Sequence, residues 1–171
     1  MRGSALSRHT VLRLISGTPP LLSGLVDLEE QLQPNGIDLT VGSVAAFTSA
    51  GRIGATNHDR VLSATADLES DAEGYFHLSP GPYLVTFNEV VTLPRDVMAL
   101  GRPRSSLLRC GAAVHSAVWD AGYSGRSQTL VVVYNPSGFR LARNARLMQL
   151  VFFSLDEEVA GYAGVYQNEN V

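Results

Sequence analysis

The chain has 171 residues, 45% of them hydrophobic and 17% charged, a composition that suits one globular domain with a sizeable core and excludes a disordered chain. Its longest apolar runs, 129–134 and 147–153, fall far short of the roughly 20 residues that a membrane helix needs, so they indicate buried strands and no membrane partner. The net charge is −3, yet all 13 basic residues are Arg and residues 101–150 hold seven of them against one carboxylate, which favours a polyanionic ligand or, equally, solvated Arg paired with acids elsewhere.

The N-terminal part of the chain contains one expected helix. Ser7 precedes four apolar residues between positions 11 and 15, and Pro19 and Pro20 follow. A Ser at a helix start accepts a hydrogen bond from the first turn, and Pro cannot continue a helix. We therefore expect a short capped helix over about 7–15.

From about Ile37 the pattern changes to short apolar runs rich in Val, Thr, Phe and Tyr, separated by Gly, Pro, Asn, Asp or Ser. Such runs are typical of strands in an all-β domain. The expected strands are 37–41, 44–48, 61–64, 75–78, 83–87, 89–93, 97–100, 112–118, 128–134, 138–141 and 147–153. With no second long helix, this spacing favours a sandwich or jelly roll over a βαβ fold. The least periodic stretch, 50–74, is expected to be an insertion or a long hairpin within one domain that spans 1–171.

The stretch from Gly101 to Arg109 combines three Arg with two Ser, Ser105 and Ser106. Guanidinium forks match phosphate oxygens, and Ser hydroxyls with nearby backbone N–H groups can complete an anion cradle. The spacing fits equally well a structural helix cap with surface Arg. The segment is therefore a candidate phosphate site that needs support from elsewhere in the chain.

A second candidate segment runs from Ala117 to Gly125, where Asp120 lies among turn-forming glycines directly before a long expected strand. Asp120 is the only acid between Asp96 and Asp156. A carboxylate in a basic site stays ionised and can orient and deprotonate a water beside a bound triphosphate. The alternative, a turn Asp in an Asp-x-Gly hairpin, fits this segment better when it is taken alone.

Five segments together resemble the ordered motifs of the dUTPase and dCTP deaminase superfamily. Each is weak alone, whereas the set in this order is specific. The segments are 33–39 (QPNGIDL), 103–107 (PRSSL), 119–125 (WDAGYSG), 144–152 (NARLMQLVF) and 162–167 (YAGVYQ). The resemblance implies a distorted jelly-roll or β-clip subunit that forms a homotrimer with active sites at the subunit interfaces.

Carried onto this sequence, the resemblance first implies a set of phosphate contacts. Arg104, Ser105 and Ser106 would bind the phosphates of the substrate, and Arg109 stands where the deaminase branch keeps a second Arg. Asp38 would help to organise the phosphate and metal region. The implied cofactor is Mg²⁺, bound through the triphosphate with no direct protein ligand.

The resemblance also implies a catalytic residue and a sugar contact. Asp120 matches the Asp of dUTPases that activates water, and Tyr123 matches the aromatic residue that packs on deoxyribose and leaves no room for a 2′-hydroxyl. Gln149 matches the Gln of the fourth motif, which lies close to the active-site hairpin. Backbone groups of about 112–119 would read the base.

The C-terminal stretch, about 160–171, is small, aromatic and rich in Gly, as expected of an arm that closes over a bound nucleotide. A terminus packed by its Tyr residues fits equally well. Because no basic residue follows Arg146, phosphate contacts from this arm would have to come from Tyr162, Tyr166 and Gln167, or from Arg of a neighbouring subunit.

One position discriminates between the two activities of the superfamily. Deaminases carry a Glu ten residues beyond the equivalent of Asp120, where it shuttles the proton for water attack on cytosine. This chain has Leu130 there, with Val131 next, and no acid lies from Ala121 to Leu155. Without a base near the ring, water has no proton acceptor, so we expect deamination to be absent. No His-x-Glu with Cys-x-x-Cys is present, which excludes a zinc deaminase.

Two departures refine the resemblance. Ala121 and Gly122 match the deaminase branch, where ordinary dUTPases have an acidic residue before Tyr, and Ser106 replaces their usual Gly. The chain is thus most similar to the deaminase-like dUTPases known chiefly from archaea.

The function expected from the sequence is hydrolysis of dUTP to dUMP and pyrophosphate by water that Asp120 activates. The alternatives are a dCTP deaminase or bifunctional enzyme, and a non-catalytic nucleotide-binding regulatory protein on the same fold. Nucleic acid is not an expected partner, because few aromatic residues are interleaved with the Arg. A single cysteine, Cys110, and the lack of a secretory-type leader favour the cytoplasm.

Overall fold

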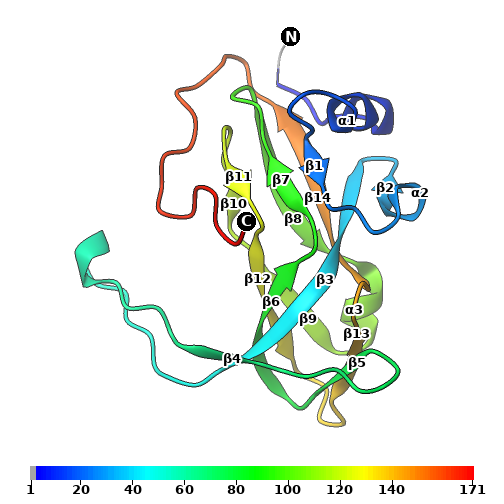
Figure 1. Ribbon diagram of the computed structural model, residues 1–171, viewed down its shortest axis with the longest axis vertical. Coiled ribbons are helices and arrows are strands. Elements are labelled where there is room, and N and C mark those ends of the chain that lie inside the picture. Colours follow the sequence, from blue (N-terminus) through cyan, green and yellow to red (C-terminus); the bar gives the residue numbers. More distant parts are fainter. Residues whose placement is uncertain (1–2) are drawn as a thin grey trace.

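The computed structural model describes residues 3–171 as a curled antiparallel β-sheet with short helices at its edge and one projecting arm (Figure 1). The helices are α1 (Arg8–Ile15), α2 (Leu28–Gln31) and α3 (Ser105–Arg109), with a 3-10 turn η1 (Asn57–Asp59). The strands are β1 (Leu22–Ser23), β2 (Leu32–Gln33), β3 (Gly36–Phe47), β4 (Thr65–Asp67), β5 (Tyr75–Leu78), β6 (Gly81–Phe87), β7 (Val90–Thr92), β8 (Val97–Pro103), β9 (Ala112–His115), β10 (Val118–Trp119), β11 (Ser124–Gly125), β12 (Gln128–Val133), β13 (Phe139–Ala142) and β14 (Arg146–Ser154).

The predicted N-terminal helix is confirmed. The hydroxyl of Ser7 accepts a hydrogen bond from the backbone N–H of Thr10, and the backbone N–H of Ser16 closes the last turn on Leu12. The apolar face of α1 contributes Val11, which is fully buried. Within residues 3–171, no helix is both long and apolar enough to span a bilayer.

The main sheet runs in the order β10–β8–β14–β3–β6–β12–β9, and the smaller sheets are β1–β7–β11 and β13–β5. Strand β3 belongs to both halves of the main sheet, because its first residues pair with β14 and its last with β6. The register shifts between Val41 and Ser43. The sequence predicted two strands here, 37–41 and 44–48, and the structure joins them across this irregularity. The all-β jelly-roll expectation is confirmed.

The core lies between the curled layers of sheet. Along β12 the side chains of Thr129, Val131 and Val133 are buried and alternate with less buried neighbours, as the period of two in a strand requires. Phe76, Phe87 and Phe152 are the largest side chains with almost no exposed surface. A buried side chain of this kind stabilises a fold by roughly 1.5–3 kcal/mol, so these residues hold the layers together.

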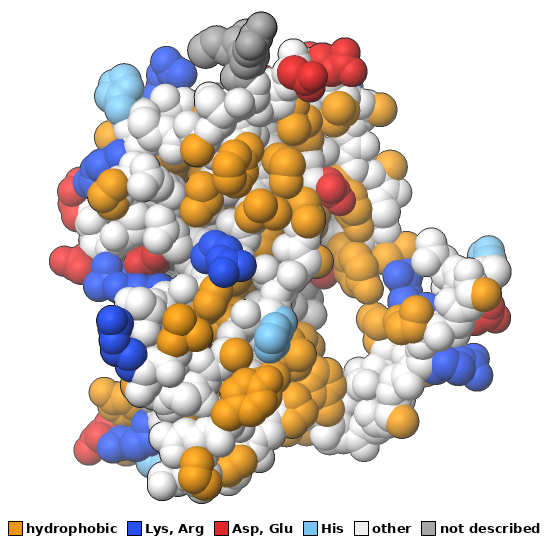
Figure 2. All heavy atoms as spheres, turned by 180° about the vertical axis from the view of Figure 1, so that it is seen from behind, with side chains coloured by type: hydrophobic (Ala, Val, Ile, Leu, Met, Phe, Trp, Pro, Cys, Tyr) orange, Lys and Arg blue, Asp and Glu red, His pale blue; other side chains and the backbone are white. Residues whose placement is uncertain are grey.

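The expected strand at 61–64 is wrong, and β4 lies at 65–67 instead. Residues 48–64 leave the body as an arm that carries η1 at its tip (Figure 1). In the space-filling view the arm stands apart from the body (Figure 2), and a hollow of about 730 Å³ separates the two. Val61 and Leu62 supply the apolar pattern of a strand, but they are half exposed or more because they line this hollow. The long-hairpin expectation for this region was therefore the better one.

A buried carboxylate, Glu89, ties β3 to the loop before β7. It is completely buried, and every contact donates to it: the amide of Gln31 at 2.7 Å, the backbone N–H of Thr40 at 2.9 Å and the hydroxyl of Thr40 at 2.5 Å. Gln31 also donates to the carbonyl of Asp38 at 2.9 Å. Burial raises the pKa of Glu89, against the effect of the Thr40 and Gln31 donors. The groups around Glu89 all donate, so this position in the fold requires a hydrogen-bond acceptor.

Glu89→Gln should lower the free energy of unfolding by about 2–3 kcal/mol, because an amide N–H₂ would face donors and leave one of them unpaired. Because its pKa is raised, the contribution of Glu89 to stability is fully present below the ordinary Glu value and is lost as the pH rises through the folded value. Since Gln does not titrate, the difference in the free energy of unfolding between the wild type and Glu89→Gln should shrink with rising pH. Urea denaturation checks this, with the exposed Glu157→Gln as control; equal stability of wild type and variant would contradict it.

Candidate active site

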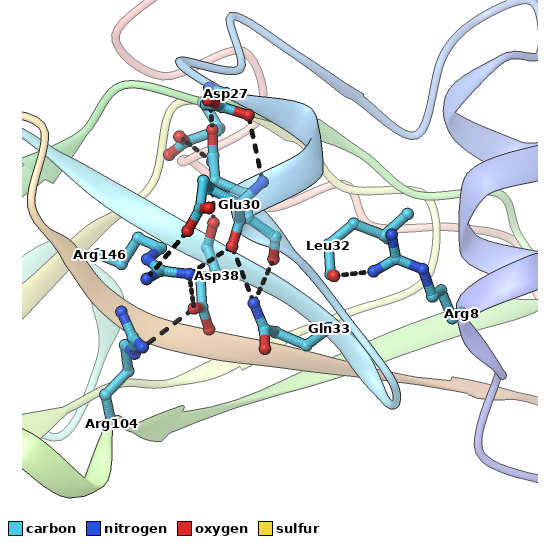
Figure 3. A network of polar contacts seen from close by, with 10 residues as sticks. Arg8, Asp27, Glu30, Leu32, Gln33, Asp38, Arg104 and Arg146 are labelled. Carbon is cyan, nitrogen blue, oxygen red and sulfur yellow. Dashed lines mark hydrogen bonds and ion pairs between the residues drawn. The ribbon is translucent and has the colours of Figure 1, made fainter.

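Two guanidiniums converge on one buried carboxylate where β3, β8 and β14 lie side by side. Arg104 Nε lies 3.4 Å from Asp38 Oδ2, and Arg146 Nη1 lies 3.8 Å from the same oxygen (Figure 3). The Asp38 side chain is 2% exposed, whereas both Arg side chains are about 30% exposed. The buried Asp38 therefore holds the two Arg by ion pairs, and part of each Arg side chain remains exposed to solvent.

The electrostatics of this cluster leave room for an anion. Burial raises the pKa of Asp38, and the charges of Arg104 and Arg146 act against that rise. Asp38 Oδ2 forms no hydrogen bond to the residues that the structure describes. Arg146 also pairs with Glu30, 3.4 Å away, but the Glu30 side chain is 69% exposed. Exposed ion pairs are weak, so a phosphate oxygen could displace Glu30 from Arg146.

The two candidate hydroxyls lie next to these Arg. Ser105 and Ser106 begin α3 and are exposed, while Leu107 fixes the helix in the core. Arg104 stands at the cap position with extended backbone and makes no side-chain cap hydrogen bond, so its guanidinium is free to face Asp38. Arg109 is exposed on the last turn of α3. The structure thus brings Arg104, Ser105 and Ser106 together and leaves Arg109 further along the helix.

Gln149 on β14 lies next to the same cluster. It is the strand partner of Asp38 on one side and of Arg102 on the other. Its side-chain amide donates to the carbonyl of Asn35 at 2.9 Å, which fixes the tight turn between β2 and β3. Gln149 therefore holds the turn that leads to Asp38.

Asp120 lies at the opposite end of β8 and β10, in the turn that follows Trp119. Its side chain is exposed, and its carboxylate forms no hydrogen bond or ion pair with any residue in 3–171. It stands at the rim shared by two hollows, one of about 280 Å³ that includes Tyr123 and one of about 420 Å³ that includes Met98. An exposed carboxylate on the rim of an aromatic pocket can hold and deprotonate a water molecule.

The wall of the smaller hollow is aromatic and rigid. The Tyr123 ring meets the Tyr162 ring edge-on, with centroids 5.8 Å apart. The Tyr123 hydroxyl contacts Ser127 Oγ at 3.1 Å and Glu169 Oε1 at 2.8 Å, and Trp119 Nε1 donates to Ser127 Oγ at 2.6 Å. Burial raises the pKa of Tyr123. The phenol therefore stays neutral and can act only through hydrogen bonds and packing.

The C-terminal segment lies on this wall. Gln167 accepts from the backbone N–H of Ser124 at 3.0 Å and donates to the carbonyl of Gly122 at 3.1 Å. The Tyr166 ring lies 5.6 Å from the guanidinium carbon of Arg60 on the arm. Tyr162, Tyr166 and Gln167 are therefore gathered beside Asp120, away from Arg104.

The two halves of the predicted site do not meet within one chain. Trp119, next to Asp120, pairs with Ala99 on β8, and Arg104 lies five residues further along the same extended segment. A strand rises about 3.3 Å per residue, so this separation is roughly 16 Å. A site that combined Asp120 with Arg104 within one chain would have to span this distance.

The structure also identifies residues that the sequence did not single out. Arg146 shares Asp38 with Arg104, and although it lies in the motif segment 144–152 and in the Arg-rich half of the chain, the sequence assigned it no role. Ser127 and Glu169 contact Tyr123 from positions without a recognisable pattern. His115 is the strand partner of Leu130, and it is exposed on β9.

Within residues 3–171, no group of three or more His, Cys, Asp or Glu side chains is placed to hold a metal ion. Asp38 offers one buried oxygen that forms no hydrogen bond, but this oxygen is ion-paired with two Arg. The donor set therefore fits a metal that arrives with its own phosphate ligands and does not fit a resident protein-bound ion.

Residues 6–155 match the dCTP deaminase-like protein family. A protein named probable deoxyuridine 5′-triphosphate nucleotidohydrolase from Methanosarcina mazei is 49% identical over 166 residues, 96% of this chain and 97% of that protein. A protein of the same name from Archaeoglobus fulgidus is 48% identical over 168 residues, 98% of each. The crystal structure of a 2′-deoxycytidine 5′-triphosphate deaminase from Agrobacterium tumefaciens is similar with a TM-score of 0.69 and 25% identity, over 90% of this chain and 49% of that one. This chain spans about half the length of that deaminase.

Arg146→Gln should weaken binding of inorganic triphosphate about ten-fold, because one charge-assisted contact is lost. Glu30→Gln should strengthen it, because Arg146 loses its competing partner. Isothermal titration calorimetry measures both effects, and Arg13→Gln on exposed α1 serves as the control for net charge. Wild-type affinity in Arg146→Gln would exclude this cluster as the anion site.

Proposed function

The chain belongs to the dCTP deaminase-like family, and we propose that it is a dUTP diphosphatase, which hydrolyses dUTP to dUMP and pyrophosphate. Near full-length relatives at 49% and 48% identity are named deoxyuridine 5′-triphosphate nucleotidohydrolases. The observation that carries the proposal is the exposed Asp120 carboxylate at the rim of the Tyr123 pocket, with no second carboxylate on the neighbouring strand β12.

The absence of that second carboxylate separates hydrolysis from deamination. Leu130 stands on β12 opposite His115, at the position where deaminases would need a Glu. A leucine cannot accept the proton that water must lose when it attacks a cytosine ring. Attack at phosphorus needs only one general base, and Asp120 supplies it.

In the reaction, the Asp120 carboxylate takes a proton from water as the water oxygen forms a bond to the α-phosphorus. The bond between this phosphorus and the oxygen that bridges to the β-phosphorus breaks, and pyrophosphate leaves. Arg104, Arg146 and the hydroxyls of Ser105 and Ser106 stabilise the negative charge that develops on the phosphate oxygens. Arg109 would reach only the outer part of a bound triphosphate.

The sugar would lie against Tyr123. Its ring is almost fully buried and is held by Tyr162 and Ser127, so it cannot move aside for an extra hydroxyl group. Rigid apolar walls of this kind reject a larger ligand by steric overlap. This supports selection of a deoxyribonucleotide.

Magnesium would enter with the triphosphate and shield its charge, as it does for nucleoside triphosphates in general. Asp38 would act on such an ion mainly through Arg104 and Arg146, because both guanidiniums lie against its buried Oδ2. We also place the enzyme in the cytoplasm, since its single cysteine is exposed and unpaired, as suits a reducing compartment.

The separation of Asp120 from Arg104 supports a homotrimer with sites between subunits. The outer face of β10, β8 and β14 carries the partly exposed apolar side chains of Met98, Leu100, Val118, Val151 and Phe153. Figure 2 shows hydrophobic side chains gathered over much of the face opposite to the view of Figure 1. Asp120 lies at one end of this apolar surface and Arg104 at the other. Packing of copies through it would bring one chain's Asp120 to the next chain's Arg104.

Asp120→Asn should reduce dUTP hydrolysis by about a thousand-fold or more, because the amide cannot accept the proton from water. Binding of dUTP should be retained. Pyrophosphate release and calorimetry measure the two effects, with exposed Asp67→Asn as control.

The wild type should hydrolyse dUTP, leave UTP intact and form no uracil nucleotide from dCTP. Full turnover by Asp120→Asn would refute the mechanism, and tight binding without turnover by the wild type would select a regulatory protein.

Mixing two inactive variants tests whether subunits share a site. Asp120→Asn and Arg104→Gln should each be inactive alone. After joint denaturation and refolding in equal amounts, about a quarter of the sites in a cyclic trimer would combine an intact Arg104 with an intact Asp120. The mixture should recover up to that share of wild-type activity. No recovery in mixed trimers confirmed by native mass spectrometry would show that each site lies within one chain.

A further inference from the structure

A directed chain of hydrogen bonds links the C-terminal segment to the aromatic residues on both sides of Asp120. Trp119 Nε1 is only a donor, so it donates to Ser127 Oγ at 2.6 Å. The Tyr123 hydroxyl donates to Glu169 Oε1 at 2.8 Å. Tyr123 must then accept from Ser127, whose oxygen lies 3.1 Å away. The order Trp119, Ser127, Tyr123, Glu169 is therefore fixed, and it ends on a carboxylate.

The chain is shielded from water along most of its length. Trp119, Ser127 and Tyr123 are 5%, 4% and 6% exposed, and Glu169 is half-buried. Burial raises the pKa of Glu169, while the phenol of Tyr123 acts to lower it. Hydrogen bonds that end on a carboxylate in a poorly hydrated site are stronger and more geometrically restrictive than exposed ones.

Backbone hydrogen bonds hold Glu169 in this position. The backbone N–H of Asn168 donates to the carbonyl of Ser124 at 2.7 Å, and the backbone N–H of Arg126 donates to the carbonyl of Glu169 at 2.9 Å. A Cβ atom on Gly125 would lie 2.7 Å from the Tyr123 hydroxyl oxygen and 3.2 Å from Cγ of Glu169. Gly125 thus leaves the space in which the carboxylate and the phenol meet.

These contacts give the C-terminal segment a role that its sequence did not suggest. Gln167 was expected at the phosphates, but its side-chain amide forms hydrogen bonds with the backbone of Ser124 and Gly122 in the turn after Asp120. The Glu169 carboxylate accepts a hydrogen bond from Tyr123. Both side chains therefore bind the protein's own turn in this conformation.

We propose that Glu169 is a positioning residue for the sugar-binding wall, because its carboxylate orients the Tyr123 ring and, through Ser127, the indole of Trp119 on either side of Asp120. The proposal rests on the proposed function only in its kinetic consequence. The hydrogen-bond chain itself can be tested without any nucleotide.

Glu169 acts through Tyr123, so its loss should affect sugar binding more than the attack of water. Glu169→Ala should raise KM for dUTP about ten-fold and change kcat by less than about two-fold, as expected when an interaction contributes equally to ground-state and transition-state binding. Glu169→Gln keeps an oxygen that accepts from Tyr123 and should restore KM to within about two-fold of the wild type. Glu158→Ala, at an exposed position just before this segment, removes the same charge and should leave both constants unchanged.

A double-mutant cycle assigns the effect to the phenol. Tyr123→Phe removes the hydroxyl that Glu169 accepts from. In that background, Glu169→Ala should raise KM no further, because the contact is already absent. Additive increases in KM would overturn the proposal.

A spectroscopic readout is independent of activity. Trp119 is the only Trp in the chain, so the protein gives a single indole N–H resonance in a ¹H–¹⁵N correlation spectrum. That resonance should shift in Glu169→Ala and stay near its wild-type position in Glu169→Gln and Glu158→Ala. An unmoved resonance in Glu169→Ala, or an unchanged KM in an enzyme that hydrolyses dUTP, would overturn the proposal. If the wild type fails to hydrolyse dUTP, the proposed function fails and the resonance alone decides the role of Glu169.

Discussion

The register between β10, β8 and β14 is the constraint on which the rest of this molecule depends. It fixes Asp120 at one end of an extended segment and Arg104 at the other, and paired strands cannot shorten to close such a gap. The exposed carboxylate of Asp120 and the guanidinium of Arg104 are therefore held at opposite ends of this segment. The partly exposed apolar side chains between them, such as Leu100 and Val151, would favour the association of copies that we propose.

Each of the two regions contains a carboxylate that orients neighbouring side chains. The buried Asp38 pairs with Arg104 and Arg146, and the half-buried Glu169 ends the hydrogen-bond chain that passes through Tyr123. In both places the anion sits behind the group that would face the ligand. This arrangement keeps guanidinium and phenol groups in one orientation before a ligand arrives, so less ordering is required on binding.

Local features of the sequence predicted what local physics decides. Ser7 marked the start of α1, and short apolar runs marked β5, β12 and β14. The strand expected at 61–64 failed because the apolar pattern of Val61 and Leu62 faces a hollow beside the arm. The gathering of Arg104, Asp38 and Gln149 followed the resemblance, but the roles of Arg146 and Glu169 did not. Those roles depend on contacts between residues more than 40 positions apart, which no spacing rule encodes.

Strand β3 is shared by both halves of the main sheet, and this has a consequence for how the protein is made. Its first residues are paired with β14, more than 100 positions later in the chain. During synthesis from the N-terminus, Ile37 can pair early with Leu32 of β2, but the β14 partners of Leu39 and Thr40 leave the ribosome more than 100 residues later. The pairing of this part of β3 thus waits for β14, and nascent chains that stop short of β14 would expose an unpaired strand edge to other chains.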